Sequence, residues 1–397
     1  MVGTASPVRE GGPLMTSLAT LLKEPDIIVC VGSGGVGKTT TSASLALGAA
    51  IAGRKTLVIT IDPAKRLADA LGLTMLSSHV ASIQPEILGS DHYKLKAPLY
   101  GMMLDLQSAW DDLVKRVGRN EQETDRILQN RFYRQLSREL VGAQEFIACE
   151  TLFSQWEIMK PDLIILDTPP TRNALDFLDA PNRIFDFLEN EAFQYFLKQR
   201  ETGRLGRMGL QFLDTAQGAF NLFLNKFAGT QFIAELSDFL FLMRDLYPPL
   251  IQRTRAFQKL LGSEKTRFLV ITQPNPQAIQ EASFFAQELK ARGLPLGGMI
   301  ANRVCQTQES LRNTLPQLKD QAINDLGISE AQWHKISAAT DAECQRATFQ
   351  QAQLTALQQQ LPQGCPHLQI PEVQEDLSTP KGLRTLLHLQ GLVTSNL

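Results

Sequence analysis

A glycine-rich run that ends in lysine and threonine constrains the fold of this chain more than any other feature. It stands between the apolar run Ile27–Val31, typical of a buried strand, and small apolar residues over 39–52, typical of a helix. The placement predicts a phosphate-binding loop; the alternative is a glycine-rich turn that holds a lysine by chance. The run fits the pattern G-x-x-x-x-G-K-[ST] and consists of Gly32, Ser33, Gly34, Gly35, Val36, Gly37, Lys38 and Thr39.

The predicted loop has the chemistry that a nucleoside triphosphate requires. Glycines let successive backbone N–H groups turn inward around phosphate oxygens, and the following helix directs the positive end of its dipole at them. We expect the Lys38 ammonium to neutralise the β- and γ-phosphates and the Thr39 hydroxyl to ligate Mg²⁺. GTPases of this architecture read guanine with an Asn/Thr-Lys-x-Asp sequence, but residues 272–275 are Thr-Gln-Pro-Asn. The sequence therefore favours ATP.

Further apolar runs indicate an α/β fold. A second strand is expected at Thr56–Ile61, and the order strand, helix, strand favours a right-handed crossover in a parallel sheet. Runs of the same character follow at Leu163–Leu166, Phe268–Thr272 and Gly298–Ala301. We predict a P-loop NTPase fold, with a mostly parallel sheet flanked by helices and an inserted helical subdomain.

The uneven spacing of these strands sets the expected domain organisation. Residues 16–397 are predicted to form one P-loop domain, into which a helical subdomain is inserted at about residues 105–155 and 183–260. Residues 1–15 are expected to form a flexible tail, and Met15 is a possible start.

Two aspartates follow predicted strands near the phosphate loop. Asp167 ends the run Leu163–Leu166, where a carboxylate reaches Mg²⁺ directly or through water; the alternative is a strand-end turn rich in Asp and Pro. The proline-containing segment 167–171 is stiff enough to register the presence of a γ-phosphate. Asp62 follows the second strand. It either orients the attacking water or N-caps a helix over residues 64–71, or does both.

Composition excludes several classes of protein. The 39 Lys and Arg nearly balance the 41 Asp and Glu, so we expect no nucleic-acid partner. The five cysteines include no Cys-x-x-Cys pair, and neither a disulfide framework nor a thiolate zinc site is indicated. The longest uncharged run, residues 39–53, is too short to span a bilayer, so we expect no integral membrane segment and a cytoplasmic location.

A glutamine-rich segment near the C-terminus is predicted to be an amphipathic helix. It covers Gln350–Gln363, and its glutamines are expected to face solvent. The apolar positions at helical spacing are Phe349, Leu354, Leu357 and Leu361.

Four motifs in the same order resemble those of the ArsA family, which includes the arsenical-pump ATPases and the ATPases that target tail-anchored proteins. The likeness covers most of the chain, from about Asp26 to Leu386. The four motifs are the phosphate loop Gly32–Thr40, the sequence Asp62-Pro63-Ala64, the segment 167–171 and the sequence Ala301-Asn302-Arg303.

This resemblance implies roles for particular residues. It implies an ATP-hydrolysing dimer in which Asp62 positions the attacking water, and Lys38 and Thr39 hold the triphosphate and Mg²⁺. It also implies that Asn302 contacts adenine. The sequence Ile370-Pro371-Glu372-Val373 resembles the family's late loop beside the base, which adds Pro371 to the predicted nucleotide contacts.

Three departures from the family pattern bear on partners. Ser33 stands where the family usually has a lysine that reaches the phosphates of the neighbouring subunit. Either Arg172, Lys65 or Arg66 substitutes, or a paralogue that carries the lysine supplies it in a heterodimer, or hydrolysis is slow. The family's zinc-binding Cys-x-x-Cys is absent, so no structural zinc is expected. The cysteines do not match a metalloid-binding trio, which argues against stimulation by arsenite.

Together, the residues and the resemblance imply a Mg²⁺-dependent ATPase that acts as a nucleotide-driven dimeric switch and handles a hydrophobic client or partner protein. Eleven of the 20 phenylalanines lie between Phe185 and Phe241, where targeting ATPases of the family carry client-binding helices. They either line a groove for an apolar helix or form the core of the insert or a subunit contact.

The sequence also leaves two other functions open. One alternative is a small-molecule phosphoryl-transfer or ligase-type P-loop enzyme, and another is a subunit of an anion or metalloid transport ATPase. A membrane-surface partitioning ATPase is disfavoured, because Gly382–Leu397 contains one arginine and no lysine.

Overall fold

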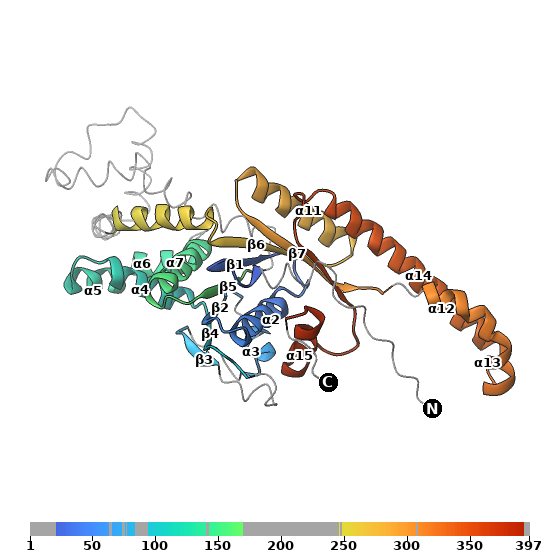
Figure 1. The fold of residues 1–397 in the computed structure, drawn as a ribbon. Coiled ribbons are helices and arrows are strands. Elements are labelled where there is room, and N and C mark those ends of the chain that lie inside the picture. Colours follow the sequence, from blue (N-terminus) through green and yellow to red (C-terminus); the bar gives the residue numbers. More distant parts are fainter. Residues whose placement is uncertain are drawn as a thin grey trace, which may run out of the picture. The chain divides into compact units, whose positions relative to one another are not determined.

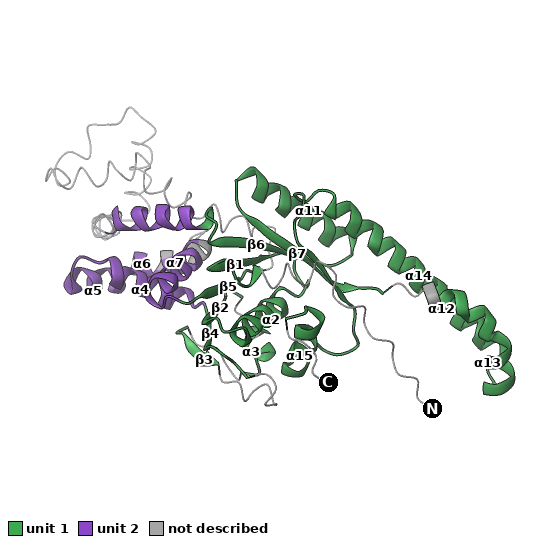
Figure 2. Ribbon diagram, viewed as in Figure 1, with its two compact units in different colours: residues 1–103, 161–174, 261–397 green, residues 104–160, 175–260 purple. Residues whose placement is uncertain are grey.

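The chain divides into two compact units (Figure 2). The first, which we call the sheet unit, is built from Met1–Met103, Pro161–Ala174 and Leu261–Leu397, and the second, the helical unit, from Leu104–Lys160 and Leu175–Leu260. The structure is a computed structural model that describes residues 21–62, 66–73, 76, 78–83, 94–139, 143–169, 246, 248–306 and 309–392.

The sheet unit contains one eight-stranded sheet among its described residues (Figure 1). The strand order is β3-β4-β2-β5-β1-β6-β7-β8, and every neighbouring pair is parallel except the antiparallel pair β3–β4. This arrangement confirms the predicted α/β fold. The strands are β1 (Ile27–Val31), β2 (Thr56–Thr60), β3 (Ala81–Ile83), β4 (Leu99–Met103), β5 (Leu163–Asp167), β6 (Thr266–Thr272), β7 (Leu296–Val304) and β8 (His367–Pro371).

The central strands explain why the sheet was recognisable in the sequence. All residues of β1, β2 and β5 are buried, as expected for parallel strands covered on both faces, and such strands appear as continuous apolar runs. Three strands were not predicted. They are β3 and β4 at one edge and β8 at the other, which are less apolar or only partly buried.

Helices cover both faces of the sheet. The crossover through α2 (Lys38–Ile51) and the crossover through α11 (Pro276–Ala291) run in opposite directions along the sheet, so their right-handedness places the two helices on opposite faces. The helices α3 (Arg66–Ala70) and α15 (Pro380–Leu389) pack with α2 (Figure 1).

The predicted glutamine-rich helix is part of a longer element, α14 (Glu330–Gln358). It begins twenty residues earlier than predicted, because Ser329 and Gln332 form a capping box at its N-terminus. It ends at Gln358, four residues before a proline, so the predicted extension through Leu361 is wrong.

The apolar face predicted for this helix is only partly correct. Leu354 and Leu357 are fully buried, whereas Phe349 is 52% exposed. The prediction of Phe349 as a buried position is therefore wrong.

Three short elements precede α14 in the chain: α12 (Glu309–Thr314), the 3-10 helix η4 (Leu315–Leu318) and α13 (Lys319–Leu326).

The helical unit contains α4 (Leu106–Val117), α5 (Glu121–Gln129), α6 (Arg131–Glu139), α7 (Ala143–Ile158) and a helical segment whose described residues in this unit are 246 and 248–260. Side chains of Asp105 and Asn120 cap α4 and α5. The buried Glu150 carboxylate joins elements far apart in the chain: it accepts from Arg253 at 2.8 Å and from Arg116 at 3.3 Å.

Part of the predicted insertion lies beyond these helices. The phenylalanine-rich segment from Phe185 to Phe241 falls outside the described residues, so the expected limits of the inserted subdomain stay a prediction. No helix in the described part of the chain is both long and apolar enough to cross a bilayer.

Candidate functional site

The glycine-rich run forms a tight loop between β1 and α2, and its geometry requires glycine. Gly37, the residue before α2, has a φ of 90°, and a Cβ there would lie 2.8 Å from Asn302 Nδ2. Gly32 has a φ of 156°, and a Cβ there would overlap the carbonyl oxygen of Ile271. The loop is therefore held in one shape by its own backbone and by the neighbouring ends of β6 and β7.

The Lys38 side chain folds back over this loop. Its ammonium donates to the carbonyl oxygens of Gly32 at 2.9 Å and Ser33 at 2.8 Å, and the residue is only 6% exposed. Burial lowers the pKa of Lys38, and Arg66 acts in the same direction, whereas Asp167 opposes the shift. A buried ammonium at the mouth of a loop of backbone amides is suited to bind phosphate oxygens.

Ser33 lies in the same loop and carries no charge to the site. It is 8% exposed, and its hydroxyl oxygen is buried without a hydrogen-bond partner. A small buried polar group of this kind has room for an acceptor that a bound ligand brings.

Asp167 ends β5 and is fully buried next to the loop. Its carboxylate accepts from Thr60 Oγ1 at 3.0 Å and from Ser42 Oγ at 3.5 Å. Burial raises the pKa of Asp167 to about 6, although the Thr39 and Thr60 bonds and the Lys38 charge oppose the shift.

This environment fits a hard cation. The Asp167 carboxylate and the Thr39 hydroxyl together offer the oxygen ligands that Mg²⁺ prefers, and they leave other coordination positions for water and phosphate oxygens. A divalent cation there would offset the cost of burying the carboxylate charge.

Asp62 lies two residues beyond β2 and is joined to Asp167 through Thr60. The Asp62 backbone N–H donates to Thr60 Oγ1 at 3.2 Å, and the same hydroxyl donates to Asp167. The Asp62 carboxylate is 3.4 Å from the guanidinium of Arg66, at the start of α3. Residues 63–65 lie outside the described residues, and both interpretations of Asp62, water positioning and helix capping, stay predictions.

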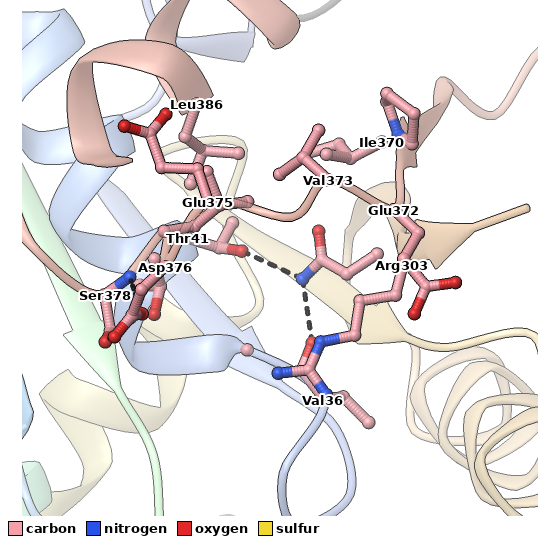
Figure 3. A pocket seen from close by; sticks show the side chains of 15 residues that line it. Val36, Thr41, Arg303, Ile370, Glu372, Val373, Glu375, Asp376, Ser378 and Leu386 are labelled. Atoms are coloured by element: carbon pink, nitrogen blue, oxygen red, sulfur yellow. Dashed lines mark hydrogen bonds between the residues drawn. The ribbon is translucent and has the colours of Figure 1, made fainter. Parts of the chain in front are cut away.

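A cavity of about 310 Å³ opens beside the loop (Figure 3). Asn302, on β7, donates from Nδ2 to Val36 O at 2.8 Å and to Thr41 Oγ1 at 3.3 Å. The structure thus brings the predicted Asn302 and Pro371 to one cavity, although they are far apart in the chain. Besides these two, its lining includes Val36, Gly37, Thr40, Arg303 and Glu372.

Three carboxylates line this cavity, and each has a partner within the protein. Glu372 pairs with Arg346 at 2.8 Å, and Glu375 pairs with Lys381 at 3.1 Å. Asp376 accepts from the backbone and the hydroxyl of Ser378 at 2.9 and 2.6 Å. The carboxylates that line the cavity are therefore engaged within the protein.

Two residues that hold the site together were not identified from the sequence. Thr60 joins Asp62 to Asp167, and Gln273 Nε2 donates to the Gly35 carbonyl oxygen at 3.0 Å. Each is a polar residue at or just beyond the carboxyl end of a strand next to the phosphate loop. Their position at the carboxyl ends of predicted strands was the signal in the sequence that could have identified them, because parallel strands bring their carboxyl ends together at one edge of the sheet.

Comparison with known proteins agrees with this geometry. A family described as anion-transporting ATPase matches residues 26–324. The chain is 27% identical to ATPase ASNA1 homolog 2 of Paramecium tetraurelia over 72% of this chain and 79% of that protein. It is 26% identical to ATPase GET3 of Malassezia globosa over 70% and 72%, and to ATPase ARSA1 of Chlamydomonas reinhardtii over 73% and 36%. The protein whose phosphate loop, buried aspartate and adjoining cavity are described above is an ATPase and belongs to the anion-transporting ATPase (ArsA) family.

Proposed function

We propose that this ATPase is a Mg²⁺-dependent, nucleotide-driven dimeric switch that handles a hydrophobic client or partner protein. The observation that carries the nucleotide part is the arrangement of a buried ammonium and a hydrogen-bonded carboxylate group at one glycine-rich loop. The Lys38 ammonium bonds to loop carbonyl oxygens, while Asp62, Thr60 and Asp167 form one hydrogen-bonded group beside it.

Each residue has a role in the proposed hydrolysis. Lys38 exchanges its loop carbonyl partners for oxygens of the β- and γ-phosphates, and backbone amides of the loop bind the same phosphates. Bound Mg²⁺, held by Thr39 and Asp167, would neutralise charge between these phosphates.

Asp62 orients the attacking water by accepting one of its protons in a hydrogen bond. The water oxygen bonds to the γ-phosphorus as the bond from that phosphorus to the bridging oxygen breaks. The products are ADP and inorganic phosphate, and one proton of the water is released.

The Thr60 hydroxyl supports a role as a switch. It accepts from the backbone N–H of Asp62, which follows β2, and donates to Asp167, which ends β5. One hydroxyl group therefore links the chain ends of these two strands. Loss of the γ-phosphate changes what Asp62 and Asp167 face, and both segments respond together.

The proposals of a hydrophobic client and of a dimer are supported by the sequence and by the relatives. The phenylalanine-rich segment between Phe185 and Phe241 supplies apolar side chains, and relatives with similar chains are GET3 and ASNA1-type ATPases. We propose a homodimer, or a heterodimer with a paralogue that has lysine at the position of Ser33. The five free cysteines favour a reducing compartment such as the cytoplasm.

The molecular mass in solution tests this proposal. We expect the purified chain, alone or mixed with a lysine-bearing paralogue, to form a dimer with a non-hydrolysable ATP analogue and Mg²⁺, and to release phosphate from ATP. Lys38→Ala is the control, because it removes the phosphate-binding ammonium. A chain that has no affinity for adenine nucleotides in the presence of Mg²⁺ would contradict the proposal.

A further inference from the structure

One positive charge near the phosphate site has no role in the mechanism described so far. Arg66 is at the first position of α3, and its guanidinium Nη1 lies 3.4 Å from the Asp62 carboxylate. Its charge also reaches Lys38. Since Ser33 is uncharged, Arg66 is a candidate for the second cation that a γ-phosphate in transfer requires.

Arg66 is held weakly where it is. Its side chain is 62% exposed, whereas that of Asp62 is 13% exposed. Water around the exposed guanidinium screens its attraction to the carboxylate, so this ion pair contributes little to stability. The guanidinium can therefore leave Asp62 when a more strongly charged partner arrives, and its planar set of donors matches a phosphate group as well as a carboxylate.

The exchange has a consequence for Asp62. While Arg66 occupies Oδ2 of Asp62, that oxygen is engaged with a guanidinium and is a poorer acceptor for a water molecule. When Arg66 moves to the phosphate, Oδ2 of Asp62 no longer accepts from the guanidinium and can accept from the water that attacks. One movement thus adds a positive charge at the γ-phosphate and exchanges the guanidinium at this oxygen for water.

We propose that Arg66 is a catalytic residue of this ATPase, acting in the same chain as Lys38: it leaves Asp62 for the γ-phosphate oxygens of bound ATP and stabilises the charge that develops there during hydrolysis. This inference rests on the proposed hydrolysis at Asp62. From the sequence, the second cation could come from Arg66, Lys65, Arg172 or a partner subunit. The inference assigns it to Arg66 of the same chain.

Nucleotide binding and turnover of Arg66→Gln test the assignment. We expect kcat to fall about 10²–10³-fold, in the range found when one transition-state donor is removed. Because Arg66 is assigned to the γ-phosphate alone, the affinity for a non-hydrolysable ATP analogue should fall while the affinity for ADP stays unchanged. Arg66→Lys keeps a positive charge and should recover part of the rate.

A matched variant controls for the loss of an arginine ion pair as such. Arg292, the residue after α11, pairs with Glu288 at 3.3 Å, also four residues apart in the sheet unit. Arg292→Gln should leave turnover and both affinities unchanged. Thermal unfolding of Arg66→Gln is expected to match that of the parent, since the side chain is exposed.

The outcomes separate this inference from the proposed function. If the parent binds and hydrolyses ATP but Arg66→Gln keeps the parental kcat and the parental preference for ATP analogue over ADP, the assignment of Arg66 is wrong and the ATPase proposal stands. If the parent itself binds no ATP, the proposed function has failed first.

Mixing subunits tests whether Arg66 acts within its own chain. A Lys38→Ala subunit retains Arg66 but lacks the ammonium that binds phosphate. Mixed with Arg66→Gln subunits, it would restore hydrolysis if Arg66 reached a neighbouring site. Our assignment predicts that the mixture is no more active than Arg66→Gln alone, and restored hydrolysis would overturn it.

Discussion

The proposed nucleotide site has two ends, a phosphate end at the glycine-rich loop and a base end at the cavity beside it, and they are built in different ways. At the phosphate end, Lys38 and Asp167 are buried, and their partners are loop carbonyls and hydroxyls of neighbouring strands. At the base end, the charged groups are paired on the surface: the side chains of Arg346 and Glu372 are each 45% exposed. Buried groups are screened little by salt and water, whereas exposed pairs are screened strongly.

This difference indicates where each part of the binding energy comes from. The phosphate end presents fixed dipoles and buried charge, which bind phosphate strongly and tolerate few substitutions. The base end offers a cavity of about 310 Å³ whose lining includes the exposed residues Arg303 and Glu372. We expect substitutions at the phosphate end to have large effects and substitutions at the base end to have small ones.

Lys38→Ala should have the largest effect on binding. The ammonium is predicted to make charge-assisted contacts to two phosphates, and at about 1.5–3 kcal/mol each their loss weakens ATP binding by about 10²–10⁴-fold. Isothermal titration with ATP and Mg²⁺ measures the change. An affinity within a factor of about three of the parent, a change of about 0.65 kcal/mol or less, would show that Lys38 does not bind phosphate.

Asp62→Asn should slow hydrolysis without weakening binding. Asparagine fills the same space but orients a water poorly, so kcat is expected to fall about 10²-fold or more while the affinity for a non-hydrolysable analogue is retained. Phosphate release and analogue titration measure the two quantities. Hydrolysis at the parental rate would show that another residue positions the water.

Asn302→Ala probes the boundary between the two ends. It removes the bond from Nδ2 to the Val36 carbonyl oxygen, and a loss of about 1–1.5 kcal/mol corresponds to roughly five- to tenfold weaker binding of ATP and ADP alike. The exposed Asn313 on α12 provides a matched control, Asn313→Ala, which should bind as the parent does. Weakening of ATP binding alone would place Asn302 in contact with the γ-phosphate instead.

Arg346→Gln should have the smallest effect. Its pair with Glu372 is exposed, so the interaction is worth less than about 1 kcal/mol and should weaken further as salt is raised. A double-mutant cycle with Glu372→Gln, read by ATP affinity at low and high salt, measures the coupling. A coupling well above that value, unchanged by salt, would mean that the base end is as firmly built as the phosphate end.

The same contrast explains what the sequence predicted. The central strands β1, β2 and β5 are buried on both faces, so their residues appear as apolar runs, and the phosphate loop has a fixed spacing because its backbone allows few alternatives. The fold and the order of its motifs followed from these runs. That Asn302 and Pro371 line one cavity was predicted only through resemblance, since β7 and β8 become neighbours only in the folded sheet.

Other features could not be predicted for physical reasons. The side chain of Gln273 reaches the Gly35 carbonyl oxygen through space, and no local pattern marks such a contact. Phe349 was predicted to be buried from its spacing alone, but spacing defines a helix face without showing that another element covers it. The strand β8 is short and only partly buried, so it lacks the apolar run that marks the central strands.

The dependence of the phosphate loop on β6 and β7 has a consequence for synthesis on the ribosome. The carbonyl of Ile271, the amide of Gln273 and the amide of Asn302 hold the shape of a loop that was translated more than two hundred residues earlier. A nascent chain that has exposed only the glycine-rich run therefore lacks the supports of that run. ATP can be captured firmly only late in translation, after the strand that carries Asn302 has left the exit tunnel and joined the sheet.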